Sequence, residues 1–335
     1  MAGEESNDFK PRCERKMKKE LNICFATDDN YAPYMGLAIL SILKHAAGEE
    51  KFHFYILDNA ISQDNKQKID RLHDVYPFQI TYLPLQESIF EGCDTYHANW
   101  TYTIFGRYLI GKIIPVDKVL YLDCDIMVRG SLLPLWKENI DDFYLAGVLD
   151  YNIICRGDLL RRFNGAVSPD EYVNSGVLLI NNRKWREENL FQKLLTFSVE
   201  NAKKLRCPDQ DAINYICRLH KKILPERYNI VGFMYKSDLF LHHPRFSEIA
   251  KERNQTVIRH FHPWKKNFFV PYREEYLELM QNSPWKDLCP VDDAKPLAWF
   301  KTVLWYLWRH PFCFLLPRFY IRWYYRGAKC LFMDY

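Results

Sequence analysis

Two aspartates separated by one residue, Asp123 and Asp125, form the sharpest local pattern in this 335-residue chain. They follow residues 118–122 (KVLYL), an apolar run that is typical of a buried strand. Carboxylates that leave a strand end one residue apart can both face a hard divalent cation such as Mg²⁺ or Mn²⁺, which would hold phosphate oxygens. Such a pair can also make turn hydrogen bonds or cap a helix. Apolar residues on both sides, however, favour a sheet edge over a solvated helix.

Phosphatases that form an aspartyl-phosphate also have two aspartates at this spacing after a strand, and the first of them is the nucleophile. In those enzymes a Thr or Val stands two residues after the second aspartate. Here that position is Met127, and the pair lies in the middle of the chain instead of on the first strand. Both departures argue against this class of enzyme.

A histidine pair, His260 and His262, lies in a late predicted strand. Alternate residues of a strand face the same side, so the two imidazoles could serve one metal or phosphate site, although histidine is also common as a structural residue. Lys265 and Lys266 follow closely and could neutralise a diphosphate. Together with the two aspartates, the histidine pair indicates a metal or phosphate site more strongly than it does alone.

Two further polar strings interrupt apolar surroundings. Asn174, Ser175 and Gly176 break an apolar strand, and residues 209–211 (DQD) begin a predicted helix after a proline. An aspartate at a helix start often serves as a cap, and a glycine in a strand can mark close backbone packing. Polar side chains beside an apolar strand would alternatively suit a polyhydroxylated ligand.

The elements that must position these residues alternate along the chain. Apolar runs predict strands over residues 21–27, 52–57, 78–83, 118–122, 144–149, 173–180 and 255–262, and helical spacing predicts helices from Pro33 onward and over 62–75, 100–114, 185–203 and 210–220. This alternation predicts an α/β fold with a mainly parallel sheet. Ligands of such sheets bind beyond the carboxyl ends of the strands, where residues 28–30 and 123–125 fall. One cleft is therefore expected.

Composition and missing motifs exclude several classes of protein. A 48% hydrophobic fraction with 26% charged residues describes an ordinary folded protein. No GxGxxG follows the first strand, and neither GxxxxGK[ST] nor GxSxG occurs, which argues against dinucleotide enzymes, P-loop NTPases and α/β-hydrolases. The ten cysteines contain no CxxC, so reduced thiols of a cytosolic protein fit better than a zinc ribbon or a disulfide scaffold. We expect neither a signal peptide in the charged residues 1–20 nor a membrane-spanning helix.

The last 37 residues differ from the rest. Residues 299–335 hold 14 of the 53 aromatic residues and six Lys and Arg against one Asp, a net charge of +5, whereas the whole chain carries +4. Basic residues at 318, 322, 326 and 329 fall on one helical face. This pattern predicts a helical tail that lies on an anionic membrane surface and gives no indication of nucleic-acid binding. Alternatively, the aromatic residues cover the rest of the folded chain as part of a core.

Five strings of the sequence, in this order and spacing, resemble the family 8 retaining glycosyltransferases. This family includes bacterial lipopolysaccharide and lipooligosaccharide galactosyl- and glucosyltransferases and the glycogenins. The strings are FATDDNYAPYMGLAILSIL, FGRYLIGKIIPVDKVLYLDCDIMVRGSL, YVNSGVLLINNRKW, PDQDAIN and HFHPWKK. The resemblance implies a GT-A fold, a Rossmann-like nucleotide-sugar-binding domain, over residues 21–270. A charged leader (1–20) and a C-terminal region carrying the basic, aromatic tail (271–335) would flank it.

The resemblance also implies roles for individual residues. It assigns the uridine to Ala26, Asp28, Asn30 and Tyr31, the donor's sugar-phosphate portion to Arg107, Mn²⁺ (or Mg²⁺) to Asp123, Asp125 and His260, and the transferred sugar to Asp150, Asn174, Asp209 and Gln210. The family's diphosphate lysine matches Lys266 by counting from His260. The usual glycine and Lys-Pro-Trp ending are replaced here by residues 262–266 (HPWKK), so Lys265 or Lys266 could serve.

These assignments lead to a predicted reaction. The expected enzyme is a metal-dependent hexosyltransferase that moves galactose or glucose from a UDP-sugar to a lipid-linked glycan, such as the lipopolysaccharide core. It would lie peripherally on the inner face of the cytoplasmic membrane. Gln210 occupies the position of a nucleophile, but an amide is a poor one, so we expect a same-face displacement. The alternatives are a glycogenin-like glucosyltransferase acting on a protein or soluble glycan, and a non-catalytic sugar-nucleotide or membrane-binding module.

Overall fold

The structure, a computed structural model, describes residues 19–97, 100–155, 157–231, 234, 246–261 and 273–288. The predictions for the leader before residue 19, for His262, Lys265 and Lys266, and for the tail from 299 onward therefore lie outside the described residues. Among the residues described, no helix is both long and apolar enough to cross a bilayer.

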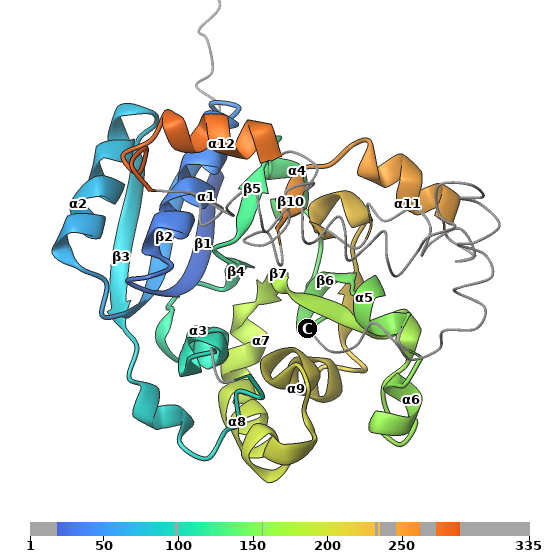
Figure 1. Cartoon of the computed structure of the whole chain (residues 1–335). Coiled ribbons are helices and arrows are strands. Elements are labelled where there is room, and N and C mark those ends of the chain that lie inside the picture. The colour runs from blue at the N-terminus through green and yellow to red at the C-terminus, as the bar shows by residue number, and fades with distance from the viewer. Residues whose placement is uncertain are drawn as a thin grey trace, which may run out of the picture.

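A seven-stranded sheet forms the centre of the fold, in the order β3-β2-β1-β4-β7-β6-β8 (Figure 1). Its strands are β1 (Lys19–Asp28), β2 (Glu50–Asn59), β3 (Phe78–Pro84), β4 (Lys118–Leu122), β6 (Leu145–Leu149), β7 (Val173–Asn181) and β8 (Lys221–Ile223). All neighbouring pairs are parallel except β4 with β7 and β7 with β6. The predicted mainly parallel α/β sheet is thus confirmed, with β7 as the reversed strand.

A smaller sheet lies beside it and consists of β5 (Ile126–Val128), β10 (Ile258–His260) and β9 (Ile230–Val231). β10 pairs antiparallel with β5, and His260 faces Ile126 in this register. β10 also pairs parallel with β9. The small sheet therefore joins the chain just after the two aspartates to the late histidine.

Helices connect and cover the strands. The α-helices are α1 (Ala32–Lys44), α2 (Gln63–Asp70), α3 (Ile110–Ile113), α4 (Leu133–Trp136), α5 (Tyr151–Ile154), α6 (Leu159–Arg162), α7 (Asn182–Glu187), α8 (Leu190–Glu200), α9 (Pro208–Ile216), α11 (Phe246–Arg253) and α12 (Arg273–Gln281). Short 3₁₀ helices are η1 (Arg71–Asp74), η2 (Glu87–Phe90), η3 (Tyr102–Leu109), η4 (Pro169–Glu171), η5 (Ala202–Lys204) and η6 (Glu226–Tyr228).

Several predicted helices differ from the structure in their type or length, and the one expected over 62–75 is α2 followed by the 3₁₀ helix η1. The helix expected over 100–114 is mostly the 3₁₀ helix η3, followed by one turn of α-helix. The helix expected over 185–203 is divided into α7 and α8 at Asn189, whose φ of 49° is left-handed. Asparagine adopts this conformation more readily than most residues, which permits a break without a glycine.

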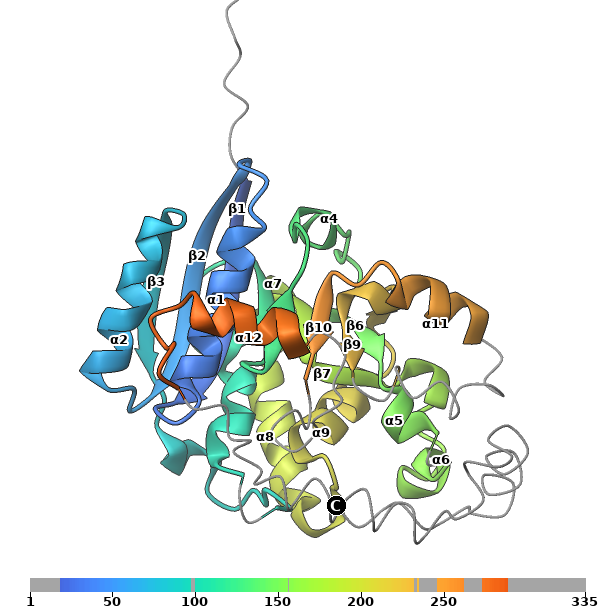
Figure 2. The same cartoon turned by 45° about the horizontal axis from the view of Figure 1, so that its top comes forward.

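Successive side chains of β1 point to opposite faces of the sheet and belong to two different apolar cores. Leu21, Ile23 and Phe25 are fully buried on the side of the sheet that α1 covers. Cys24 belongs to the core on the other side, which η3, α3, α7, α8 and α9 help to form. Figure 2 shows α1, α2 and α12 over β1, β2 and β3, with α8 and α9 away from them. The architecture is therefore a three-layer α/β/α arrangement.

α1 is buried along almost its whole length, from Ala32 to Leu43. The proline in its first turn has no N–H to leave unpaired, which suits a helix start. Residues 273–288 pack onto this layer, because Tyr276, Met280 and Trp285 belong to the same core as α1. Figure 2 shows α12 crossing α1.

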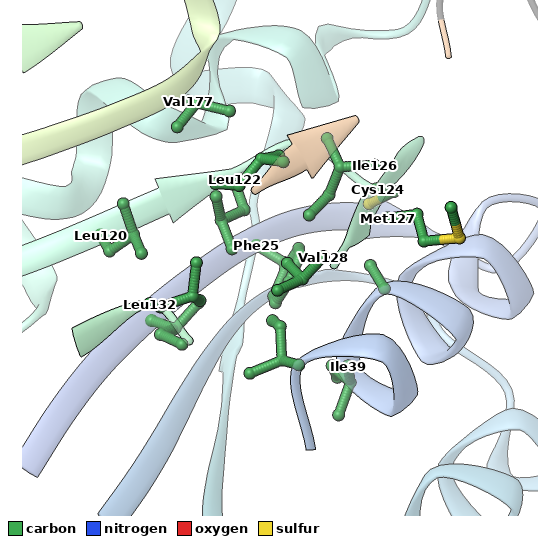
Figure 3. Close-up of a cluster of buried hydrophobic side chains, with 14 of the residues drawn as sticks. Phe25, Ile39, Leu120, Leu122, Cys124, Ile126, Met127, Val128, Leu132 and Val177 are labelled. Carbon is green, nitrogen blue, oxygen red and sulfur yellow. The ribbon is translucent and has the colours of Figure 1, made fainter. Parts of the chain in front are cut away.

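The same core extends beneath the two aspartates (Figure 3). Cys124, the residue between them, is only 5% exposed and lies in this core with Ile126 and Met127. Because a single residue separates the aspartates, anchoring Cys124 in the core leaves both carboxylates free to point the other way.

Candidate active site

Asp123 and Asp125 occupy the short link between β4 and β5 at the carboxyl-end edge of the large sheet. Backbone hydrogen bonds fix this link on both sides. The N–H of Asp123 donates to the carbonyl of Gly176 at 2.8 Å, and the N–H of Phe261 donates to the carbonyl of Asp125 at 2.9 Å. The link is thus held between β7 and the end of β10.

His260 completes a cluster with these two aspartates. Its Nε2 lies 3.2 Å from Oδ1 of Asp125 and 3.9 Å from Oδ2 of Asp123. One ligand atom from each of the three residues lies within 4.8 Å of the other two. Two carboxylates and an imidazole suit a divalent cation such as Mn²⁺.

The backbone of β7 approaches this cluster closely at Gly176. A Cβ added to Gly176 would lie 2.4 Å from Cε1 of His260 and 2.5 Å from Oδ2 of Asp123, far inside contact distance. Glycine is thus required here because β7 passes close to the side chains of His260 and Asp123. The donor set and this close approach together fit a bound cation.

The pKa of the His260 imidazole is lowered by its burial but raised more strongly by Asp125 and then Asp123, so the net shift is upward. Negative charge around a buried nitrogen favours a proton and would equally favour a metal ion. A metal bound at Nε2 would replace that proton.

Arg107 lies behind Asp123 and is itself buried. Its Nη2 donates to Oδ1 of Asp123 at 3.0 Å, and the hydroxyl of Tyr121 donates to the same oxygen at 3.0 Å. The other carboxylate oxygen of Asp123, Oδ2, faces His260. These two donors therefore orient the carboxylate.

Asp209 shares the Arg107 guanidinium, with its Oδ2 3.3 Å from Nε, and accepts a 3.0 Å hydrogen bond from the Ser175 hydroxyl. Burial raises the pKa of the Asp209 carboxyl, and Arg107 only partly opposes this shift. Burial lowers the pKa of Arg107, but Asp123 and then Asp209 raise it by more in total. The net shift is upward, so the guanidinium stays charged. The two aspartates and the arginine form one ionic group, in which Arg107 and Asp209 are buried.

Gln210 is held by hydrogen bonds at both ends of its amide. Its Oε1 accepts from the N–H of Ser175 at 2.9 Å and from Nδ2 of Asn174 at 3.2 Å. Its Nε2 donates to Oδ2 of Asp150 at 2.9 Å and to the Tyr172 hydroxyl at 3.2 Å. The amide is therefore fixed in one orientation.

Asp150 belongs to the same group of polar residues. Its Oδ1 caps α5 by accepting from the N–H of Ile153 at 3.2 Å, and its Oδ2 accepts from Nδ2 of Asn174 at 3.1 Å. Asp150, Asn174, Asp209 and Gln210, which the resemblance places around the transferred sugar, thus lie together.

The residues expected at the uridine lie at the end of β1. Oδ1 of Asp28 accepts a 2.9 Å hydrogen bond from the N–H of Tyr31, and Asn30 is exposed in the loop between them. Burial and then the Asp125 carboxylate raise the pKa of the Tyr31 phenol to about 12. Ala26 accepts a 3.5 Å hydrogen bond from the Cys124 thiol at its carbonyl. This loop therefore adjoins the cluster of Asp123, Asp125 and His260.

Three partners in the site escaped the sequence analysis. Tyr121 precedes Asp123 by two residues on the same face of the strand, so strand alternation could have identified it. Tyr172 and Asn229 carry no local signal, because only the tertiary structure brings them to Gln210 and His260.

Comparison with known proteins agrees with this arrangement. Residues 22–267 match the sequence profile of Glycosyl transferase family 8. The chain therefore belongs to family 8 of the glycosyltransferases, and the predicted family is confirmed.

Two relatives and one solved structure that resemble this chain are named as glycosyltransferases. A putative glycosyltransferase of Haemophilus influenzae is 34% identical over 210 residues, which are 62% of this chain and 63% of that protein. The lipopolysaccharide 1,2-glucosyltransferase of Escherichia coli K12 is 26% identical over 288 residues, which cover 84% of this chain and 83% of that protein. The crystal structure of the galactosyltransferase LgtC with donor and acceptor sugar analogues is similar with a TM-score of 0.69 at 27% identity, and the match covers 79% of this chain and 96% of LgtC.

Proposed function

We propose that this protein transfers a hexose, galactose or glucose, from a UDP-sugar to a lipid-linked glycan such as the lipopolysaccharide core, with retention of configuration and with a bound Mn²⁺ or Mg²⁺. The observation that carries the proposal is the cluster of Asp123, Asp125 and His260 directly beside the polar group around Gln210. A cation site and a sugar site side by side are what a nucleotide-sugar donor requires.

The donor would extend from the loop after β1 to the polar group around Gln210. Asp28, Asn30 and Tyr31 would hold the uridine, with the backbone at Ala26. Asp123, Asp125 and His260 would hold the cation, which when bound supplies positive charge to the departing diphosphate. Lys265 or Lys266 would add a further positive charge. Such electrostatic stabilisation commonly contributes about 3 kcal/mol.

In this proposal Arg107 holds the Asp123 carboxylate in position relative to β7. Its hydrogen bonds to Asp123 and to the carbonyl of Ser175, at 2.5 Å, connect the metal-binding residues to the start of β7. A contact with the sugar-phosphate portion of the donor stays a prediction for this side chain.

Retention of configuration would follow from a same-face displacement. The bond from C1 to the diphosphate oxygen breaks, the acceptor oxygen bonds to C1 on the same face, and the acceptor's proton passes to the departing diphosphate. Two observations support this course: the amide of Gln210 is occupied at both ends, and Asp209 is paired with Arg107. Isolation of a covalent sugar adduct on either residue would overturn this mechanism.

A donor panel tests the proposed function most directly. Purified full-length protein is mixed with Mn²⁺ and UDP-galactose, UDP-glucose, UDP-N-acetylgalactosamine or UDP-N-acetylglucosamine, and the release of UDP is measured with and without lipopolysaccharide-core acceptors. We expect one hexose donor to dominate and the acceptor to accelerate UDP release. No turnover of any UDP-sugar would overturn the proposal. Transfer only to protein or glycogen-like acceptors would instead indicate the glycogenin-like activity.

The acceptor class also predicts where the protein works. We propose that residues 299–335 hold the enzyme on the anionic inner face of the cytoplasmic membrane, on the basis of their charge and aromatic pattern. Sedimentation with anionic vesicles tests this directly. A chain ending before residue 299 should lose vesicle binding but still hydrolyse the donor, and unchanged vesicle binding would refute the membrane role of this segment.

A further inference from the structure

We propose that Asn229 is a positioning residue that fixes the tautomer and the orientation of His260, so that the lone pair of Nε2 faces the two aspartates. This inference rests on the proposed metal site and identifies the residue that prepares it. Asn229 follows η6 and immediately precedes β9. It is only 1% exposed, and its Oδ1 lies 3.1 Å from Nδ1 of His260.

The two ends of an asparagine amide are distinguished by the partners they face. The partners of Asn174 permit only one orientation of its side-chain amide. The Asp150 carboxylate can only accept when ionised, so the atom that faces it at 3.1 Å must be the donor Nδ2. The N–H of Gly176 can only donate, so the atom at 3.0 Å from it must be the acceptor Oδ1.

The orientation of the Asn174 amide determines the orientation of the Asn229 amide. Oδ1 of Asn174 also lies 2.8 Å from the side chain of Asn229, which must therefore present its donor Nδ2 there. The acceptor Oδ1 of Asn229 is then left for His260. An acceptor at 3.1 Å from Nδ1 requires that Nδ1 carries the hydrogen.

The tautomer of His260 thus follows from a chain of hydrogen bonds that starts at one carboxylate and one backbone N–H. With the hydrogen on Nδ1, a neutral imidazole directs its Nε2 lone pair at the site between Asp123 and Asp125, 3.2 Å from the latter. Hydrogen bonds of this kind to a metal-binding histidine typically affect metal affinity by about 10- to 100-fold.

The same chain joins the two halves of the site. Asn229 contacts His260 at one end of its side chain and Asn174 at the other, and Asn174 contacts Gln210 and Asp150. Asn229 therefore positions a proposed metal ligand and a proposed sugar-binding residue together, without reaching either ligand itself.

Two variants of Asn229 separate its effects. Asn229→Ala removes the acceptor, so we expect Mn²⁺ binding about 10- to 100-fold weaker and a mixture of His260 tautomers. Asn229→Asp keeps an acceptor for Nδ1–H but cannot donate to Asn174. It should therefore retain the Nδ1–H tautomer and most of the Mn²⁺ affinity, while KM for the UDP-sugar rises.

The readouts are the dissociation constant of Mn²⁺, from titration calorimetry or electron paramagnetic resonance, and the His260 tautomer from ¹⁵N NMR of the metal-free protein. The tautomer is read at a pH where the imidazole is neutral, with His260→Gln used to assign the signal. Asn182→Ala is the matched control, because Asn182 is also buried and donates only to the carbonyls of Ile114 and Val116 at the opposite sheet edge. It should bind Mn²⁺ like the wild type.

The inference is overturned if Asn229→Ala binds Mn²⁺ like the wild type, or if neutral His260 in the wild type carries its hydrogen on Nε2. The tautomer is measured in the wild type, so this second outcome does not depend on the variant folding. If the wild type shows the Nδ1–H tautomer but binds no Mn²⁺, the proposed function fails while the positioning of His260 by Asn229 stands.

Discussion

The core around α1 and the carboxyl-end edge of the sheet are both buried, but they are built from opposite kinds of residue. Around α1, apolar side chains fill the space and Trp285 lies directly over Gly36. At the sheet edge, Arg107, Asp209 and Gln210 are buried polar groups; Arg107 pairs with Asp209, and all three form hydrogen bonds with Ser175.

This difference shows which part of the molecule stabilises the fold and which part prepares chemistry. Burial of apolar surface stabilises a protein, whereas burial of charges costs free energy that their mutual contacts only partly recover. Substitutions in the α1 core should therefore change stability and leave catalysis alone, whereas substitution of a partly exposed carboxylate at the sheet edge, such as Asp125, should mainly change catalysis.

The largest expected effect is on stability, in Trp285→Ala. The ring is 3% exposed, and its Nε1 donates to Oδ1 of Asn65 at 2.9 Å. Removal of a buried tryptophan lowers the free energy of unfolding by about 3–5 kcal/mol. Urea unfolding measures this loss, with Leu219→Ala as control because Leu219 is 77% exposed. Turnover of the folded variant at low temperature should equal that of the wild type, and a large loss would show that the α1 core also shapes the site.

Asp125→Asn should have the next largest effect, on activity alone. The amide offers one neutral oxygen in place of a charged ligand, so kcat/KM should fall by about 10²- to 10³-fold. The free energy of unfolding should stay the same or rise, because one of two neighbouring negative charges is removed. Asp64→Asn, on the exposed side of α2, provides the control. Turnover near the wild-type level in Mn²⁺ buffer would refute the proposed metal site.

Lys221→Met tests the cost of a largely buried charge on β8. Burial lowers the pKa of Lys221 from its ordinary 10.5 to about 8, with its Nζ 2.9 Å from Oδ1 of Asn214. Between these two pH values the unfolded chain holds a proton that the folded chain has released, so wild-type stability rises with pH in this window.

The variant lacks this rise. Below pH 8, Lys221→Met should therefore be more stable than the wild type by roughly 2–3 kcal/mol, and the difference should shrink toward zero near pH 10.5. Oδ1 of Asn214 keeps the N–H of Val173 as a donor in the variant. Urea unfolding of both proteins at several pH values measures the difference, and a constant difference would contradict the buried charge.

Gly176→Ala should produce the smallest effect of the four. The added methyl group would push His260 and Asp123 apart, so Mn²⁺ affinity should fall by about 10- to 100-fold. Gly130→Ala is the matched control, because a Cβ at Gly130 meets nothing closer than Val257 at 3.8 Å. Titration calorimetry compares the two variants, and equal Mn²⁺ affinities would show that β7 leaves the cluster more room than its backbone indicates.

Local patterns predicted much of this fold and part of the site. The strand before Asp123 and the helix after Pro33 lie where apolar runs and a proline indicate them. The 3₁₀ helix η3 and the break at Asn189 were not predicted, because helical spacing of apolar residues does not distinguish 3₁₀ from α-helix or reveal a single left-handed residue.

The sequence by itself determined the family, the acid pair at a strand end and the types of residue available for a metal and a sugar. These follow from order and spacing along the chain. Only the tertiary structure decided which residues meet. β7 runs antiparallel to β4, so Asn174 at its start reaches the same edge as Asp123 after the end of β4. Pairing of β10 with β5 brings His260 there from far along the chain. Such pairings depend on long-range packing and hydrogen bonding, which no local pattern records.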